Sequence, residues 1–179
     1  MPRYAAFLRG INVAGRKATS AQLRACFEGI GCDDVATFRA SGNIIFSAAG
    51  AAGPLGKRIE RALKDSLGYE AAAFVRTAAE IKAIAKHDPF DARAVAQSKG
   101  KLQVVLLAAK PPASVAKQIK ALQSDDDLLA LRGRELYWLP SAGLMDSAVG
   151  MDGITKTVGP NTMRTKGTLD QLAAKFFSG

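Results

Sequence analysis

The feature that most constrains the fold is a short pattern that occurs twice in the chain. It is an Arg-Thr pair followed by apolar residues four and seven positions after the threonine, and its two copies are Arg76-Thr77 with Ile81 and Ile84, and Arg164-Thr165 with Leu169 and Leu172. Each pair ends a stretch whose apolar spacing predicts strand, helix, strand, turn, strand, helix and strand. The repeated order predicts an internal duplication.

The first half gives the clearer version of this order. Thr19 and Gln22 have the spacing of a capping box, which predicts a helix that begins there and ends at Gly31. The residues around Gly42 predict a tight hairpin turn. In this half we expect strands at Tyr4–Arg9, Val35–Ala40, Ile44–Ser47 and Ala71–Arg76, and helices that begin near Thr19, Pro54 and Thr77.

The second half repeats the order more loosely. Its expected strands are Leu102–Ala109, Leu128–Arg132, Leu136–Leu139 and Thr162–Thr165, and its expected helices follow Pro112, run from Leu144 to Val158, and run from Thr168 to Phe177. A β-α-β-β-α-β order is typical of the ferredoxin-like plan. We therefore predict an α+β protein with two ferredoxin-like units in tandem, each an antiparallel sheet with helices on one face. A single mixed sheet is the alternative.

Changes in composition along the chain suggest the domain boundaries. Residues 92–101 are polar and interrupt the apolar pattern, which is typical of a linker. The first unit, with an extra helix, is then predicted at residues 1–91. The second, more divergent unit, with a C-terminal helix, is predicted at residues 102–179.

The composition favours a cytoplasmic protein without a membrane segment. The apolar run at residues 4–8 is too short for a signal peptide, and residues 104–109 fall far short of a spanning helix. Cys26 and Cys32 are too few for a secreted disulfide scaffold, so we expect reduced thiols.

The formal charge of +9 favours an anionic partner. The basic residues form no run, but three stretches contain no acidic residue: Met1–Phe27 with five basic residues, Ala92–Ser124 with six, and Gly153–Thr168 with three. An anionic ligand or nucleic acid is therefore the expected partner.

Several patterns that carry well-known chemistry are incomplete. The chain has one histidine, His87, and we expect it in a loop at a helix end, where its positive form suits the helix dipole. Two cysteines and one histidine do not make a zinc site, and Asp125-Asp126-Asp127 lacks the spacing of a calcium loop. The stretch Gly53–Lys57 departs from the spacing of a phosphate loop. We expect no cofactor and no metal.

Aromatic residues on central strands would suit RNA recognition by a ferredoxin-like sheet. The candidates by residue type are Tyr4, Phe7, Phe46, Tyr137 and Trp138. The signature of that RNA-binding module is absent, so we expect most of these side chains in the core.

Polar residues in loops form a better candidate site. Arginine offers a fork of donors for phosphate or carboxylate, and Asn, Ser and Thr add short hydrogen bonds. The candidate ligand-binding residues are Arg9, Asn12, Arg16, Lys17, Ser41, Asn43, Thr162 and Arg164. A local role is equally open, because Ser41 and Asn43 can satisfy their own turn and Arg9 can pair with an acid.

Three segments of the chain resemble a known protein family. The segments Phe7–Val13, Thr37–Ser47 and Val75–Thr77 resemble the domain-of-unknown-function family 1697. The resemblance implies a small bacterial cytosolic protein with a duplicated ferredoxin-like fold, and it implies no particular activity. Family residues match at Arg9, Gly10, Asn12, Ser41, Gly42 and Asn43, and also at Thr162, Arg164 and Thr168.

The chain departs from the family pattern at three positions. Ala14 replaces a customary glycine, Thr165 replaces a customary asparagine, and Lys166 replaces a customary aromatic residue. If the family binds a ligand by stacking on that aromatic residue, this chain has lost the contact.

These observations rank three functions. The first is a binding module for a phosphate-bearing ligand or nucleic acid, and the second is a structural or interaction protein whose loop residues serve only the turns. An enzyme that acts on a small anionic metabolite, with Arg9 and Arg164 as electrostatic clamps, ranks last because the chain shows no evident general base. We therefore assign no catalytic residue.

Overall fold

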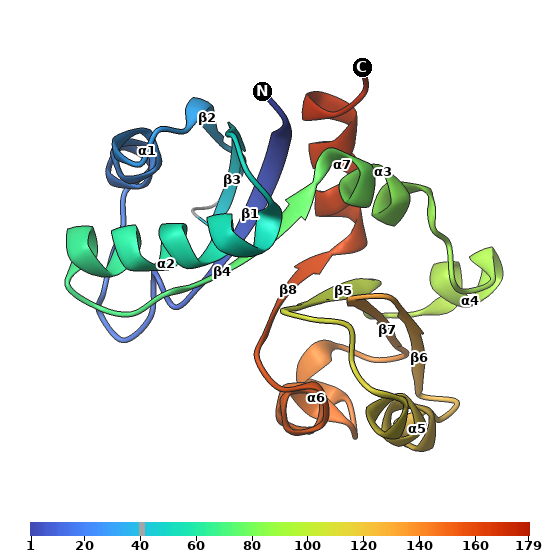
Figure 1. Ribbon diagram of the computed structural model, residues 1–179. Helices are drawn as coiled ribbons and strands as arrows, with labels where there is room; N and C mark the ends of the chain where they lie inside the picture. The colour runs from blue at the N-terminus through green and yellow to red at the C-terminus, as the bar shows by residue number, and fades with distance from the viewer. Residues whose placement is uncertain (40–41) are drawn as a thin grey trace. The chain divides into compact units, whose positions relative to one another are not determined.

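The computed structural model describes residues 1–39 and 42–179. The chain forms two compact units (Figure 1). The first unit contains Met1–Ala83 together with Leu172–Gly179, and the second contains Ile84–Gln171. The domain boundaries that the composition suggests, at residues 1–91, 92–101 and 102–179, stay a prediction. The two compact units are defined by contacts between residues, and the first unit joins two segments that are far apart in the chain.

The first unit is built on a four-stranded antiparallel sheet with the strand order β2-β3-β1-β4. Two helices, α1 and α2, cover one face of the sheet (Figure 1). Its elements are β1 (Arg3–Arg9), α1 (Ser20–Gly29), β2 (Asp33–Thr37), β3 (Asn43–Ser47), α2 (Ala52–Leu67) and β4 (Ala72–Thr77). The order of these elements along the chain is the ferredoxin-like order predicted from the sequence.

Both faces of β1 are buried, which explains its nearly continuous apolar sequence. Tyr4, Ala6 and Leu8 pack with α1 and α2 in one hydrophobic core. Ala5 and Phe7 point to the other face and are also buried. The first sheet therefore offers no exposed aromatic residue on β1.

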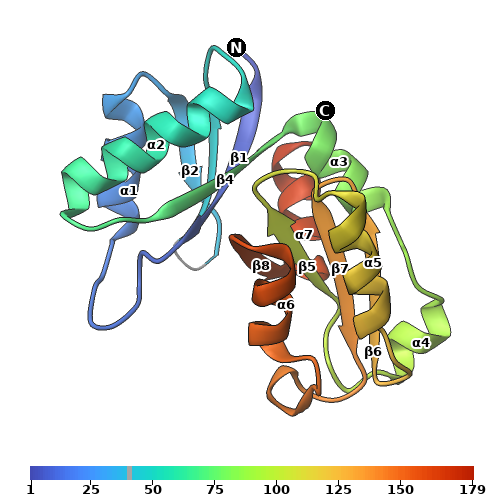
Figure 2. The same cartoon turned by 60° about the horizontal axis from the view of Figure 1, so that its bottom comes forward.

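The second unit repeats the plan with the strand order β6-β7-β5-β8. Helices α5 and α6 lie over one face of its sheet (Figure 2). Its elements are β5 (Gln103–Leu107), α5 (Ala113–Leu122), β6 (Asp127–Arg132), β7 (Glu135–Pro140), α6 (Gly150–Val158) and β8 (Asn161–Thr165). The predicted α+β fold with two ferredoxin-like sheets is confirmed.

The repeated Arg-Thr pairs mark equivalent strand-to-helix junctions. Helix α3 (Ala78–Lys86) follows β4, and α7 (Lys166–Phe176) follows β8. The hydroxyl of Thr77 accepts from the Glu80 amide at 3.2 Å, and the hydroxyl of Thr165 accepts from the Thr168 amide at 3.2 Å. Each threonine thus satisfies a backbone donor in the first turn of its helix. The predicted start of the last helix at Thr168 is wrong, because Thr165 already provides this cap.

Two further predictions about local structure need correction. The helical pattern from residue 144 to residue 158 is interrupted, since only Leu144–Asp146 forms a 3-10 helix (η1) before α6 begins at Gly150. Gly150 has a φ of +62°, which breaks the helix, and its amide is capped by the Ser147 hydroxyl at 3.2 Å. The polar stretch after Asp91 is also not wholly irregular, because Ala92–Gln97 forms α4.

Among the helices that the structure describes, none combines the length and the hydropathy needed to cross a bilayer. Cys26 and Cys32 are buried free thiols. Burial raises the pKa of both thiols, and this disfavours the reactive thiolate.

Candidate functional site

Five of the eight candidate residues lie at one end of the first sheet. Arg9 ends β1, and Asn12, Arg16 and Lys17 lie in the loop that follows it. Asn43 begins β3, where it pairs with Phe7 of β1, two residues before Arg9. The strand register therefore brings Asn43 to the same end of the sheet as the loop between β1 and α1.

Tyr69 fixes the conformation of this loop. Its hydroxyl donates to the carbonyl oxygen of Ile11 at 2.7 Å, and the guanidinium of Arg16 lies 4.9 Å from the centre of its ring. The side-chain oxygen of Asn12 accepts from the Ala18 amide at 2.9 Å and closes the loop. The loop between β1 and α1 is therefore held at three places.

Three residues of the same loop have left-handed backbone conformations. Gly10 and Gly15 have φ values of +86° and +78°, and Ala14 has a φ of +52°. A non-glycine residue in this region costs roughly 1–2 kcal/mol. This position therefore favours glycine, and the chain accepts strain at Ala14.

Asn43 has a structural role in its turn. It is buried, and its side-chain nitrogen donates to the carbonyl oxygen of Phe38 at 3.1 Å. The carbonyl oxygen of Asn43 accepts from the Phe38 amide at 2.9 Å, and that of Gly42 accepts from the Leu8 amide at 2.7 Å. Ser41 lies outside the described residues. Asn43 therefore ties the turn between β2 and β3 to β1.

Thr162 and Arg164 belong to β8 of the second unit. A guanidinium nitrogen of Arg164 donates to the Thr162 hydroxyl and to the Met163 carbonyl oxygen, each at 2.8 Å. Burial lowers the pKa of Arg164 to about 10, which leaves the side chain charged at neutral pH. The equivalent Arg76 of β4 is fully buried and donates to the Val75 carbonyl oxygen in the same way, at 3.1 Å. Both arginines therefore brace their own strand ends.

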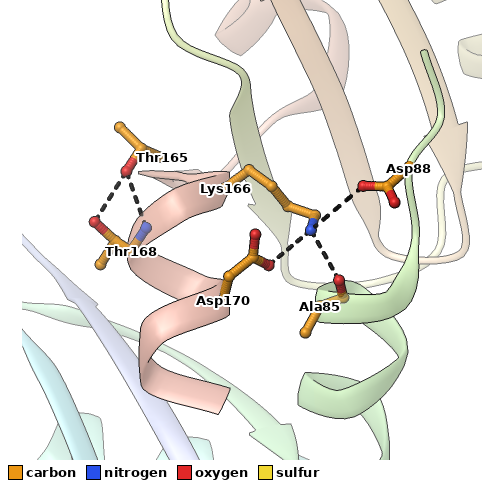
Figure 3. A network of polar contacts seen from close by, with 6 residues as sticks. All are labelled: Ala85, Asp88, Thr165, Lys166, Thr168 and Asp170. Carbon is orange, nitrogen blue, oxygen red and sulfur yellow. Dashed lines mark hydrogen bonds and ion pairs between the residues drawn. The ribbon is translucent and has the colours of Figure 1, made fainter. Parts of the chain in front are cut away.

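Lys166 is the centre of a polar network that sequence reasoning missed (Figure 3). Its ammonium group donates to the carbonyl oxygen of Ala85 at 2.9 Å and to the Asp170 carboxylate at 2.7 Å, and it lies 3.9 Å from Asp88. The lysine is 6% exposed. A buried charge requires such partners, and this network supplies them. The available sequence signal was a basic residue at a position where the resembled family pattern has an aromatic residue.

His87 lies beside this network, and the prediction that its positive form is favoured is wrong. Its ring contacts Tyr137 edge-to-face, with 4.9 Å between the ring centres. Burial lowers the pKa of His87, and the nearby Arg132 lowers it further. The neutral ring is therefore favoured.

Two other sequence candidates are absorbed into the fold. Gly53–Lys57 lies inside helix α2, so its backbone amides are not arranged as a phosphate loop. The five aromatic candidates for RNA stacking, Tyr4, Phe7, Phe46, Tyr137 and Trp138, are all buried. Core packing accounts for them, as expected from the sequence.

Two sheets with the same strand order, each covered by a pair of helices, define a duplicated ferredoxin-like α+β protein. Residues 1–137 match the model of the family described as "Protein of unknown function (DUF1697)", and the chain belongs to that family. None of the curated proteins matches the chain.

A solved structure supports the fold along the whole chain. The conserved bacterial protein SP0830 from Streptococcus pneumoniae is similar, with a TM-score of 0.73, 19% sequence identity, and coverage of 97% of each chain. At this identity the similarity shows the fold alone.

Proposed function

We propose that the protein is a cytosolic binding module for a phosphate-bearing ligand, and that the loop between β1 and α1 holds this ligand. Arg9, Arg16 and Lys17 are the expected phosphate contacts, with Asn12 shaping the loop around them. The observation that carries the proposal is a braced loop with two exposed cations, next to a third exposed cation, Arg9, at the end of β1. A braced loop loses little conformational entropy when a ligand binds.

The charge around this loop supports the proposal. Met1–Phe27 contains no acidic residue, and the first turn of α1, which follows the loop, also contains none. The N-terminus of a helix carries a partial positive charge. The backbone oxygen of Glu70 lies beside Gly10, and its carboxylate forms an ion pair with Lys64 at 3.0 Å, which reduces the repulsion of an anion by Glu70. The field at the loop therefore favours negative charge.

The test is a titration with inorganic tripolyphosphate followed by calorimetry, at about 50 mM and about 200 mM salt, because phosphate contacts weaken as salt rises. The matched variants are Arg16→Gln/Lys17→Gln in the loop and Lys117→Gln/Lys120→Gln on α5, all at exposed positions. We expect the loop variant to bind at least about tenfold more weakly, since each charge-assisted contact contributes about 1.5–3 kcal/mol and about 1.4 kcal/mol is a factor of ten. The α5 variant should bind like the wild type. Absence of binding at low salt, or equal loss in both variants, contradicts the proposal.

A structural role is the second candidate, and the bonds of Asn43 and Arg164 favour it. Asn43 donates to the carbonyl oxygen of Phe38 in the turn before its strand, and Arg164 donates to that of Met163 in its own strand. Under this alternative, Arg164→Ala lowers stability and changes no binding. Arg9→Ala with unchanged tripolyphosphate affinity would likewise favour it.

A further inference from the structure

The first unit carries a cluster of two phenylalanines and three cations that lies outside the proposed loop site. We call it the phenylalanine–cation cluster, and its members are Arg3, Phe38, Arg39, Lys175 and Phe176. The two rings meet edge-to-face, with 5.7 Å between their centres. All five residues belong to one compact unit, although the chain separates them widely.

The cations lie over the two rings. Arg3 lies 5.8 Å from the centre of Phe176, and Arg39 lies 5.6 Å from the centre of Phe38. The ammonium group of Lys175 lies 5.8 Å from Phe38 and 5.3 Å from Phe176. The three cations are exposed and the two rings are partly exposed. Aromatic surface and positive charge are therefore available to solvent at the same place.

The backbone presents this cluster under strain. Arg39 has a φ of +56°, a conformation that arginine seldom adopts. Asn43, which is buried, holds the carbonyl oxygen of Phe38 and so fixes the residue before Arg39. Strained residues persist where the surrounding structure fixes them, and they concentrate at functional sites.

The charge around the cluster is complementary to a polyanion. The segments 35–39 and 171–178, which supply four of the five residues, contain no acidic side chain. Asp33 and Asp34 lie at the other end of β2, and Asp34 accepts a hydrogen bond from Ser47 at 3.2 Å. Arg3, which pairs with Ser47, is the cation on that side. The end of the cluster around Phe38 and Lys175 therefore carries the stronger positive field.

We propose that the phenylalanine–cation cluster binds single-stranded nucleic acid. A base stacks on Phe38 or Phe176, and the phosphates on either side of it lie against Arg39, Lys175 and Arg3. Aromatic rings beside cations suit single strands because an unpaired base exposes its flat face, whereas a duplex hides it. This inference rests on the proposed function and names its phosphate-bearing ligand as a polynucleotide.

Continuity between the two sites supports this choice of ligand. Arg3 and Arg9 lie on the same face of β1, because alternate residues of a strand share a face. The side-chain bond from Asn43 joins the turn that carries Phe38 to the end of the sheet that carries Arg9. An extended chain of phosphates can reach both places, and a small anion cannot.

The experiment measures fluorescence anisotropy with a labelled single-stranded oligonucleotide, as RNA and as DNA of one sequence, and with the corresponding duplex. Phe38→Leu and Phe176→Leu remove a ring and keep the apolar contact. Phe90→Leu, at a partly exposed position of the second unit, is the matched control. We expect the first two to weaken single-strand binding by about fivefold or more, while Phe90→Leu has no effect. Their affinity for tripolyphosphate should not change.

Two variants at exposed positions keep the test decisive if a leucine variant does not fold. Lys175→Gln removes one cation, and Arg39→Asn removes another while retaining a residue that tolerates a positive φ. Each should weaken oligonucleotide binding more than Lys117→Gln does. Circular dichroism checks that every variant is folded.

The outcomes separate this inference from the proposed function. Binding of tripolyphosphate without binding of oligonucleotide overturns the inference and leaves the proposed function standing. Oligonucleotide binding that is unchanged in Phe38→Leu, Phe176→Leu, Lys175→Gln and Arg39→Asn also overturns it. Failure to bind either probe refutes both proposals.

Discussion

A buried aspartate in the second unit gives the sharpest prediction about stability. Asp127 is fully buried at the start of β6. One of its carboxylate oxygens accepts from the indole nitrogen of Trp138 at 2.8 Å and from the Ser147 hydroxyl at 2.6 Å. Its second oxygen is also buried and has no hydrogen-bond partner among the described residues. The carboxylate therefore secures the segment before α6 to the sheet.

Removal of the carboxylate leaves two donors without an acceptor. The indole of Trp138 is fully buried and cannot donate to water instead, so the loss of its hydrogen bond costs about 2–3 kcal/mol. The loss of the bond from the partly buried Ser147 hydroxyl adds about 1 kcal/mol. We therefore expect Asp127→Ala to lose about 3–4 kcal/mol of unfolding free energy. Ser147→Ala should lose about 2 kcal/mol, from one hydrogen bond and the cap of Gly150.

Asp127→Asn separates the bonds from the charge. Its amide oxygen can still accept from Trp138 and Ser147, so the loss should be less than half of that in Asp127→Ala. The assay is urea unfolding followed by tryptophan fluorescence, because Trp138 is the single tryptophan and reports on this unit. The reasoning is refuted if the asparagine variant is as unstable as the alanine variant, or if Ser147→Ala exceeds both.

Three other perturbations test features described above. Ala14→Gly should raise the unfolding free energy by about 0.5–1 kcal/mol in a urea titration, because glycine accepts the positive φ there; no gain would show that the strain is absent. The free energy of unfolding should fall by about 1–2 kcal/mol in Lys166→Met and by less than about 0.5 kcal/mol in Asp88→Asn. The reason is that the bonds of Lys166 to Ala85 and Asp170 are short, whereas Asp88 lies farther from its ammonium group. Stability should fall as the pH falls below about 6.5, since the lowered pKa of His87 means that the unfolded chain binds the proton more tightly. His87→Gln should remove part of that decline in thermal melts across this range, and an unchanged profile would contradict the assignment.

The parts of the fold that depend on local chemistry could be predicted from the sequence. The capping box at Thr19 needs only residues three positions apart, and it forms as expected. The helix predicted near Thr77 also forms, with Thr77 and Glu80 bonded in the same way. The antiparallel sheets follow from the β-α-β-β-α-β order of the elements, so they too could be predicted. The break before α6 was missed because apolar spacing alone does not reveal that Gly150 adopts a positive φ.

Only part of the candidate site could be predicted from the sequence, because its contacts join residues that are far apart in the chain. Arg9, Asn12, Arg16 and Lys17 could be grouped since they are neighbours in the chain. The bond from Tyr69 to Ile11 spans 58 positions, and no periodicity predicts it. The contact between Phe38 and Phe176 depends on how the last helix packs, which neither segment encodes alone.

The division of the chain into units has a consequence for its biosynthesis. The first unit needs residues 172–179, which emerge only after all of residues 84–171 have been made. At about 5–20 residues per second, a ribosome needs roughly 4–18 s to cover that interval. During this time residues 1–83 are already made, while Phe38 still waits for Phe176. The unit whose synthesis begins first therefore cannot be completed until the C-terminal helix has been made.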